Sequence, residues 1–111
     1  MQIKNISQSI FLEVMGDSPV NRVLNFLDFN DEYDYSLTDI AHHSSVGYST
    51  LQLFWKKLEK HRLVVQTRKV GKAKMYKLNK QNPIIKNFQK MAFELCKKQS
   101  GKLEKKVLVF S

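Results

Sequence analysis

Lysine and arginine side chains gather in the second half of the chain, and the chemistry they offer is the binding of a polyanion. Up to Trp55 the sequence carries two Lys or Arg and seven Asp or Glu, a net charge of −5, whereas from Lys56 onward it carries seventeen and three, a net charge of +14. An imbalance of this size predicts a polyanionic partner for the second half. A basic surface that merely keeps the protein soluble is the alternative that the charge leaves open.

Four of these cations surround Gly71, which is the expected turn residue of a β-hairpin. Residues 63–67 are rich in β-branched side chains and residues 75–78 read as a returning strand, so the two segments predict an antiparallel pair. At or near its tip would lie Arg68, Lys69, Lys72 and Lys74, where long cations can reach phosphates or a minor groove. Because so short a tip has little to pack on, we expect the charges of Arg68 and Lys72 to need a partner outside the domain.

Residues 36–60 come before the hairpin and predict two helices joined by a tight turn. Ser36 with Asp39 three residues later is an acidic variant of the capping box. Ser44 and Ser45 predict the end of the first helix, and Gly47 can cap the second. In the second helix, side chains at helical spacing predict one buried stripe of Leu51, Phe54, Trp55 and Leu58. This order is typical of a helix-turn-helix, whose second helix enters a major groove.

The outer face of that second helix supplies the candidate DNA contacts. The amide of Gln52 can pair bidentately with adenine, while Lys56 and Lys57 are expected on phosphates. Leu53 also points outward, where it either meets a thymine methyl or is an ordinary exposed leucine. With the start of the helix and the hairpin included, the predicted DNA-binding set is Tyr48, Ser49, Thr50, Gln52, Leu53, Lys56, Lys57, Arg68, Lys69, Lys72 and Lys74.

Amphipathic sequence leads into this unit from the N-terminal side. Residues 1–15 predict a helical extension that Gly16 ends, with apolar side chains at Ile3, Ile6, Ile10, Phe11 and Val14. Ser18 and Pro19 then predict the start of a second helix, which should end near Phe29. Its buried stripe would consist of Val20, Val23, Leu24 and Leu27. Residues 33–35 alternate as a very short strand would.

A last amphipathic helix is expected to begin at Pro83 and to end at residues 99–101, with Gly101 as its left-handed terminator. Its apolar stripe is predicted to mediate a homodimer, and packing on its own domain is the alternative that the pattern leaves open. The stripe consists of Ile84, Ile85, Phe88, Met91, Ala92 and Leu95. The tail that follows holds an apolar run at residues 107–110, for which strand, helix and disordered end all remain open, as does packing on a partner chain.

Together these elements predict a mainly helical α+β fold, a winged helix-turn-helix with a three-helix core and a β-hairpin wing. Residues 16–81 would form the winged-helix DNA-binding domain, residues 1–15 an N-terminal helical extension, and residues 82–111 a C-terminal helix and tail that dimerise.

Catalysis and metal binding find little support in the sequence. It has no glycine-rich phosphate loop and no nucleophile elbow, so we expect no enzyme and no cofactor. His42 and His43 are adjacent and point about 100° apart on a helix, and no metal-ligand spacing links them to His61 or Cys96, so we expect no metal site. One cysteine excludes an intramolecular disulfide. Without a signal peptide or an apolar stretch of membrane-spanning length, a cytoplasmic location is expected.

The order of elements and several phrases resemble a family of small archaeal winged-helix transcriptional regulators of the ArsR/MarR type. The phrases are residues 16–24, 34–41, 50–51, 55–59 and, most specifically, the wing phrase at residues 67–79. The resemblance implies DNA binding, a homodimer and no known ligand. The turn is Ser45-Val46-Gly47, where the family often has Gly-Val-Ser. The recognition helix begins with Tyr48-Ser49, where the family often has basic residues. The second difference leaves the DNA target sequence open.

Two other functions remain compatible with these observations. One is a winged-helix adaptor whose basic face binds an acidic protein. The other is an architectural protein that coats DNA without reading its sequence.

Overall fold

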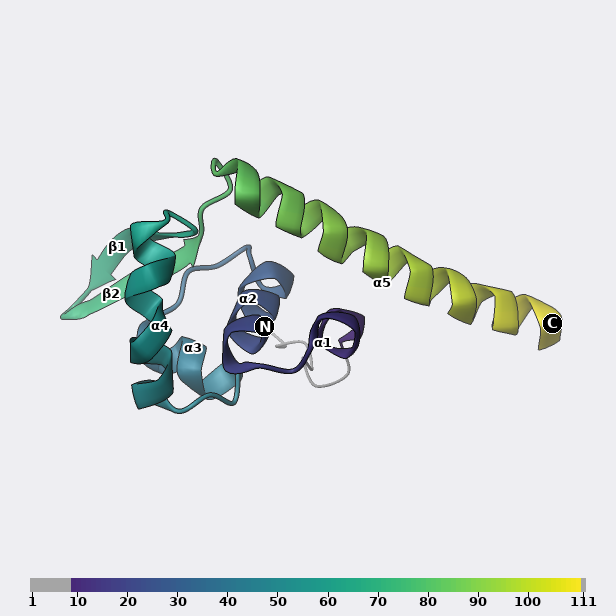
Figure 1. Cartoon of the computed structure of the whole chain (residues 1–111), viewed down its shortest axis with the longest axis horizontal. Coiled ribbons are helices and arrows are strands. Elements are labelled where there is room, and N and C mark those ends of the chain that lie inside the picture. The colour runs from purple at the N-terminus through teal and green to yellow at the C-terminus, as the bar shows by residue number, and fades with distance from the viewer. Residues whose placement is uncertain (1–8, 111) are drawn as a thin grey trace.

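A computed structural model describes the backbone of residues 9–110 and the side chains of residues 9–98. Helices α2, α3 and α4 form the body of the molecule, the hairpin β1–β2 leaves it at one side, and α5 extends away from it at the other (Figure 1). The elements in chain order are α1 (Ile10–Met15), α2 (Pro19–Phe29), α3 (Leu37–His43), α4 (Tyr48–Lys60), β1 (Val64–Val70), β2 (Ala73–Leu78) and α5 (Pro83–Phe110).

The helix boundaries in the body follow the cap residues of the sequence. The Ser18 hydroxyl accepts the backbone N–H of Asn21 at the start of α2, and the Ser36 hydroxyl accepts that of Asp39 at the start of α3. Each cap thereby satisfies one of the N–H groups that a helix leaves unpaired at its beginning. Both predicted starts are confirmed, and α2 ends at Phe29 as expected.

The turn between α3 and α4 also forms where the sequence placed it. Ser44 caps the end of α3, and Ser45 adopts a left-handed backbone with φ of 57°. Val46 is buried, and its N–H donates to the carbonyl of Ala41 at 2.9 Å, so the turn is fixed from inside. Gly47 is the N-cap of α4 and offers no side-chain hydrogen bond.

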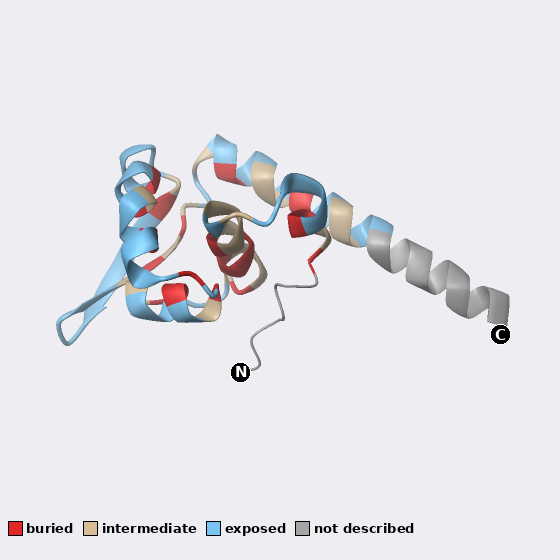
Figure 2. Ribbon diagram, turned by 60° about the horizontal axis from the view of Figure 1, so that its bottom comes forward, coloured by how far each residue is buried: buried red, intermediate tan, exposed pale blue. Residues whose placement is uncertain are grey.

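Helix α2 lies at the centre of the core, because it contacts α1, α3, α4 and β2. Figure 2 shows buried positions gathered where α2 packs between the other helices. The predicted stripe of α4 is confirmed, with Leu51, Trp55 and Leu58 buried and Phe54 half-buried. On α2 the prediction named too narrow a face, since Phe26 and Asn25 are also buried. A helix with neighbours on several sides buries more than one stripe.

The hairpin is longer than the sequence predicted. Its register runs from Val64 opposite Leu78 to Val70 opposite Ala73, with an irregularity between Gln66 and Arg68 that resembles a β-bulge. Arg68, which the sequence placed at or near the tip, belongs to β1 and pairs with Met75, so it lies near the tip but not in the turn. The tip itself is the turn at Gly71, whose φ of 61° suits glycine, followed by Lys72.

A single backbone bridge joins the hairpin to the segment before α3. Tyr35 donates its N–H to the carbonyl of Tyr76 at 2.9 Å and accepts the N–H of Tyr76 at 2.8 Å. This bridge is what remains of the short strand predicted at residues 33–35.

Helix α5 does not end where the sequence predicted. It continues through Gly101 to Phe110, so the expected left-handed terminator is wrong and the tail is helical. A glycine inside a helix costs about 1 kcal/mol but does not end it when helix-forming residues follow. At the other end of the chain, α1 covers only Ile10–Met15. The predicted contributions of Ile3 and Ile6 lie outside the described residues.

Polar and aromatic contacts attach the described part of the N-terminal extension to the body. The Ser9 hydroxyl accepts the N–H of Phe11 and donates to the buried side chain of Asn25 on α2 at 3.0 Å. Phe11 packs edge-on against Phe88 of α5, with 5.3 Å between the ring centroids. Helix α1 is thus held between α2 and α5.

The apolar stripe of α5 divides into two parts. Ile85 and Ala92 are buried within this chain, and Phe88 and Leu95 are packed against the same core. Ile84 is 60% exposed, and Met91 is exposed beside it on the helix surface. Intrachain packing therefore accounts for four of the six residues that the sequence assigned to a dimer interface, and Ile84 and Met91 face solvent in the single chain.

Replacing Phe11 by alanine should lower the free energy of unfolding by about 3 kcal/mol, because it removes a buried ring from the contact between α1 and α5. Phe93, which is 62% exposed on α5, provides a matched control, and Phe93→Ala should change stability by about 0.5 kcal/mol or less. Urea unfolding followed by circular dichroism measures both. Equal losses in the two variants would contradict this packing.

Candidate nucleic-acid interface

Helix α4 presents one face of exposed, mainly polar side chains. Leu51, Trp55 and Leu58 hold the opposite face against the core, so α4 cannot rotate without exposing them. The outward residues that the sequence assigned to DNA binding are all exposed, namely Tyr48, Ser49, Thr50, Gln52, Leu53, Lys56 and Lys57. The arrangement leaves this face open to a partner along the whole helix.

The lysines of this surface form no ion pair with the acidic side chains that the structure describes. Within residues 9–98, the ion pairs are Arg22–Asp17, Arg68–Asp34, Lys80–Asp31 and Lys97–Glu94. None of these involves the predicted DNA-binding lysines, which are Lys56, Lys57, Lys69, Lys72 and Lys74. Five exposed ammonium groups without an internal counter-ion produce a positive potential that attracts a polyanion.

A shallow groove brings the two predicted halves of the site together. It lies between the start of α3, the start of α4 and the hairpin, and its volume is about 240 Å³. Tyr48 of α4 lines it together with Lys72 and Lys74 of the hairpin, although more than twenty residues separate them in the sequence. Ser36 and Thr38 line it as well. The local sequence pattern predicts Ser36 only as a helix cap and indicates no role for Thr38.

Arg68 does not extend freely from the wing. Its Nε and Nη2 donate to the two carboxylate oxygens of Asp34 at 2.9 and 3.1 Å, and the hydroxyl of Thr67 donates to the same carboxylate. The expectation that the charge of Arg68 needs a partner outside the domain is therefore wrong. Thr67 and Arg68 lie at the irregularity in β1, and both side chains reach Asp34 in the loop before α3. The lysines of the hairpin, by contrast, remain unpaired among the described residues.

The pKa of Asp34 reflects this contact. The hydrogen bonds from Arg68, and then from Thr67, lower it from 3.8 to about 2. The Asp34 side chain is only 15% exposed, whereas that of Arg68 is 63% exposed, so solvent weakens the pair from one side. Asp34 is therefore ionised at neutral pH, and it binds the hairpin to the loop before α3.

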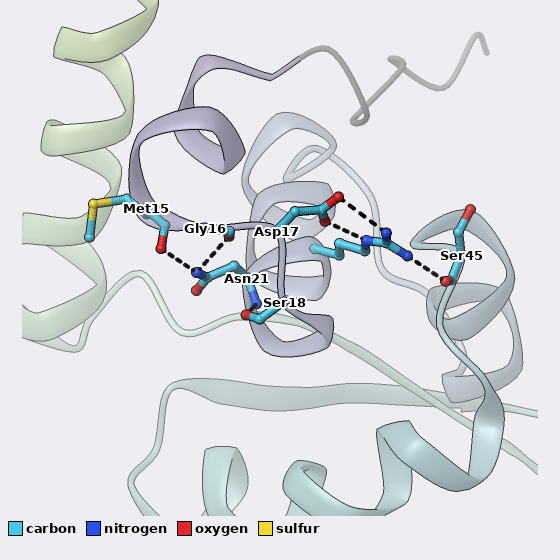
Figure 3. A network of polar contacts seen from close by, with 7 residues as sticks. Met15, Gly16, Asp17, Ser18, Asn21 and Ser45 are labelled. Atoms are coloured by element: carbon cyan, nitrogen blue, oxygen red, sulfur yellow. Dashed lines mark hydrogen bonds and ion pairs between the residues drawn. The ribbon is translucent and has the colours of Figure 1, made fainter.

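A second polar network connects the N-terminal segment to the turn of the helix-turn-helix (Figure 3). Arg22 of α2 binds the carboxylate of Asp17 through Nε and Nη2, and its Nη1 donates to the backbone carbonyl of Ser45 at 3.0 Å. Asn21 donates to the carbonyl of Gly16 at 3.0 Å. The hydrogen bond to Arg22 lowers the pKa of Asp17. The sequence analysis missed this network, since nothing in the local pattern links Arg22 to Ser45.

The histidines of α3 contribute to packing. His43 stacks on Phe26 with 5.5 Å between the ring centroids, and His42 meets His43 edge-on at 5.1 Å. In the part of the chain that the structure describes, no group of three or more His, Cys, Asp or Glu is placed to hold a metal ion. Among the same residues, no helix has the length and apolar character that crossing a bilayer requires.

The winged-helix fold predicted from the sequence is confirmed by comparison with a solved structure. The crystal structure of the adhesin competence repressor AdcR from Streptococcus pyogenes superposes with a TM-score of 0.58 at 15% sequence identity. The match covers 92% of this chain and 78% of AdcR. At this identity the likeness shows a shared fold. The sequence itself matches no family model and no curated protein.

Replacing Asp34 by asparagine should lower the free energy of unfolding by about 1 kcal/mol at pH 7, a value that allows for the exposure of Arg68. Because the pKa of Asp34 is lower in the folded state than its value of about 3.9 in unfolded chains, its contribution is complete above that value and is lost as the pH falls toward 2. The two proteins should therefore converge in stability between pH 5 and pH 2.

Urea unfolding across this pH range measures the difference. Glu32→Gln, an exposed change in the same loop, serves as the control and should leave stability nearly unchanged throughout. A difference between wild type and Asp34→Asn that stays constant with pH would contradict the ion pair.

Proposed function

We propose that the protein binds double-stranded DNA as a transcriptional regulator, with α4 in the major groove and the hairpin on the phosphate backbone or in the adjacent minor groove. The observation that carries the proposal is the convergence of an exposed polar face on α4 with the unpaired lysines of the wing, joined by one groove. An α-helix fits a major groove, and lysines beside it can neutralise phosphates.

The fold supports a regulatory role for this binding. AdcR, which shares the fold, is named a repressor. A helix-turn-helix places side chains of its second helix on base edges, so the binding should depend on sequence. Gln52 is the proposed adenine contact, and Tyr48, Ser49 and Thr50 at the start of α4 are proposed to reach phosphates or base edges. Lys56, Lys57, Lys69, Lys72 and Lys74 would supply most of the sequence-independent affinity.

Arg68 takes a different part in this proposal from the lysines. Its guanidinium is held by Asp34, so a phosphate contact from Arg68 would have to share it with that carboxylate or displace it. Its main contribution would then be to set the direction of the wing, and Lys69, Lys72 and Lys74 would contact the nucleic acid.

A homodimer is the proposed assembly. Two copies related by a two-fold axis would place two recognition helices about 34 Å apart, one turn of duplex, so the DNA site would be nearly palindromic. Ile84 and Met91 are the two residues of the predicted α5 stripe that packing within the chain leaves exposed. They are the first candidates for the contact between copies.

Salt dependence tests the DNA-binding proposal. For a dimer that neutralises about 6–10 phosphates, the log of the affinity should fall with the log of the salt concentration at a slope of about −5 to −9. Lys72→Ala should weaken all duplexes about equally and reduce the slope by about one unit for each lost phosphate contact. Lys90→Ala on α5 removes the same charge away from the groove and should change neither quantity.

Fluorescence anisotropy titrations on a preferred and a scrambled duplex provide the measurement. Gln52→Ala should cost about 1–3 kcal/mol on the preferred duplex and little on the scrambled one. Equal losses on both duplexes would indicate an architectural DNA-coating protein. The absence of any duplex binding at low salt would refute the proposal and favour an adaptor that binds an acidic protein.

The dimer has its own test. Ile84→Glu and Met91→Glu place charges on the exposed side of α5 and should halve the mass measured by light scattering, because a carboxylate in an apolar interface is costly. Lys86→Glu on the other side of the same helix is the control and should leave the mass unchanged. A wild-type protein that is monomeric at high concentration would refute the dimer, while DNA binding by a monomer would remain possible.

A further inference from the structure

Leu53 occupies an unusual place on the candidate interface. It is 79% exposed, more than any other large apolar side chain within the described residues. Its neighbours one helical turn away are Ser49, Lys56 and Lys57, all exposed and polar. Single exposed leucines are common on proteins. This one, however, lies opposite the buried stripe of α4, at the middle of the surface that would enter the major groove.

None of the arginines of the chain lies on α4, so none can contact bases from that helix. Arg22 is bound to Asp17 and Ser45, and Arg68 is bound to Asp34. Arg62 follows the end of α4, which itself contains no arginine. Arginine on guanine is the commonest specific contact in protein–DNA complexes, and α4 lacks the residue that makes it.

The remaining groups on α4 match an A·T pair better than a G·C pair. The amide of Gln52 matches the N6 and N7 edge of adenine, and an apolar side chain matches the 5-methyl group of thymine. Successive residues of a helix point about 100° apart, so Gln52 and Leu53 would meet neighbouring base pairs. Both residues therefore favour A·T pairs. The lysines of α4 can also reach guanine, but as mobile charges they contribute mainly to phosphate binding.

We propose that α4 reads A·T pairs and that Leu53 does so by packing on a thymine methyl group. This inference rests on the proposed DNA binding and specifies the class of DNA site that the protein selects. The contact would remove the leucine side chain and the thymine methyl from water. It would thus favour thymine over a base without the methyl group, and it requires no hydrogen bond.

Thymine-to-uracil replacement tests the inference, because uracil lacks the 5-methyl group and keeps the hydrogen-bonding groups. The full chain is first used to select preferred duplexes from a random pool, and thymines in the selected site are then replaced one at a time. At one thymine in each half-site, wild-type affinity should fall about fourfold, the ratio that corresponds to one buried methyl group. Leu53→Ala should bind the thymine and uracil duplexes equally. Val65→Ala, an exposed apolar change on β1, should keep the fourfold difference.

The possible outcomes separate the two proposals. If the protein selects a site but no uracil replacement weakens it, the reading by Leu53 is refuted while the DNA-binding proposal stands. The same holds if Leu53→Ala still distinguishes thymine from uracil, or if the selected half-sites contain only G·C pairs. If no duplex is bound at low salt, the proposed function fails, and this inference fails with it.

Discussion

Tyr76 is the residue on which the geometry of the candidate interface depends. Its backbone pairs with Tyr35 just before α3, and its buried ring packs edge-on against Trp55 of α4 with 5.2 Å between the centroids. One strand residue thus fixes the hairpin against both helices of the helix-turn-helix. The contacts of Asp34 with Thr67 and Arg68 hold the neighbouring strand from the side. Because these contacts set the angle of the wing, Lys72 and Lys74 line the same groove as Tyr48.

The acidic residues near the wing are paired in ways that leave the positive charge of the wing lysines in place. Asp34 contacts β1 directly, and its carboxylate forms an ion pair with Arg68. Asp31 pairs with Lys80 and accepts a hydrogen bond from Gln89 of α5. The arginine of the wing is therefore used for architecture, while the more flexible lysines are left for a ligand. Lysine suits contacts with a phosphate backbone, since such contacts need charge more than fixed geometry.

The flanking helices serve the stability of the single chain as well as any assembly. Phe11 and Phe88 meet between α1 and α5, and Ile85 extends the core of the winged helix onto α5. Arg22 connects the segment after α1 with the carbonyl of Ser45 in the turn that leads into α4. Arg22 therefore links the segment between α1 and α2 to the turn before the candidate recognition helix.

Local features of this protein follow directly from the sequence. The caps at Ser18 and Ser36, the turn at Ser44–Gly47, the buried stripe of α4 and the winged-helix order all depend on residues within a few positions of one another, and all are confirmed. Arg68 binds Asp34, which is 34 residues away, and Arg22 binds the carbonyl of Ser45, which is 23 residues away. No local sequence pattern could reveal either contact. Tertiary packing also decided which part of the α5 stripe is buried, because the stripe is continuous in sequence but α1 and the core cover only one side of it.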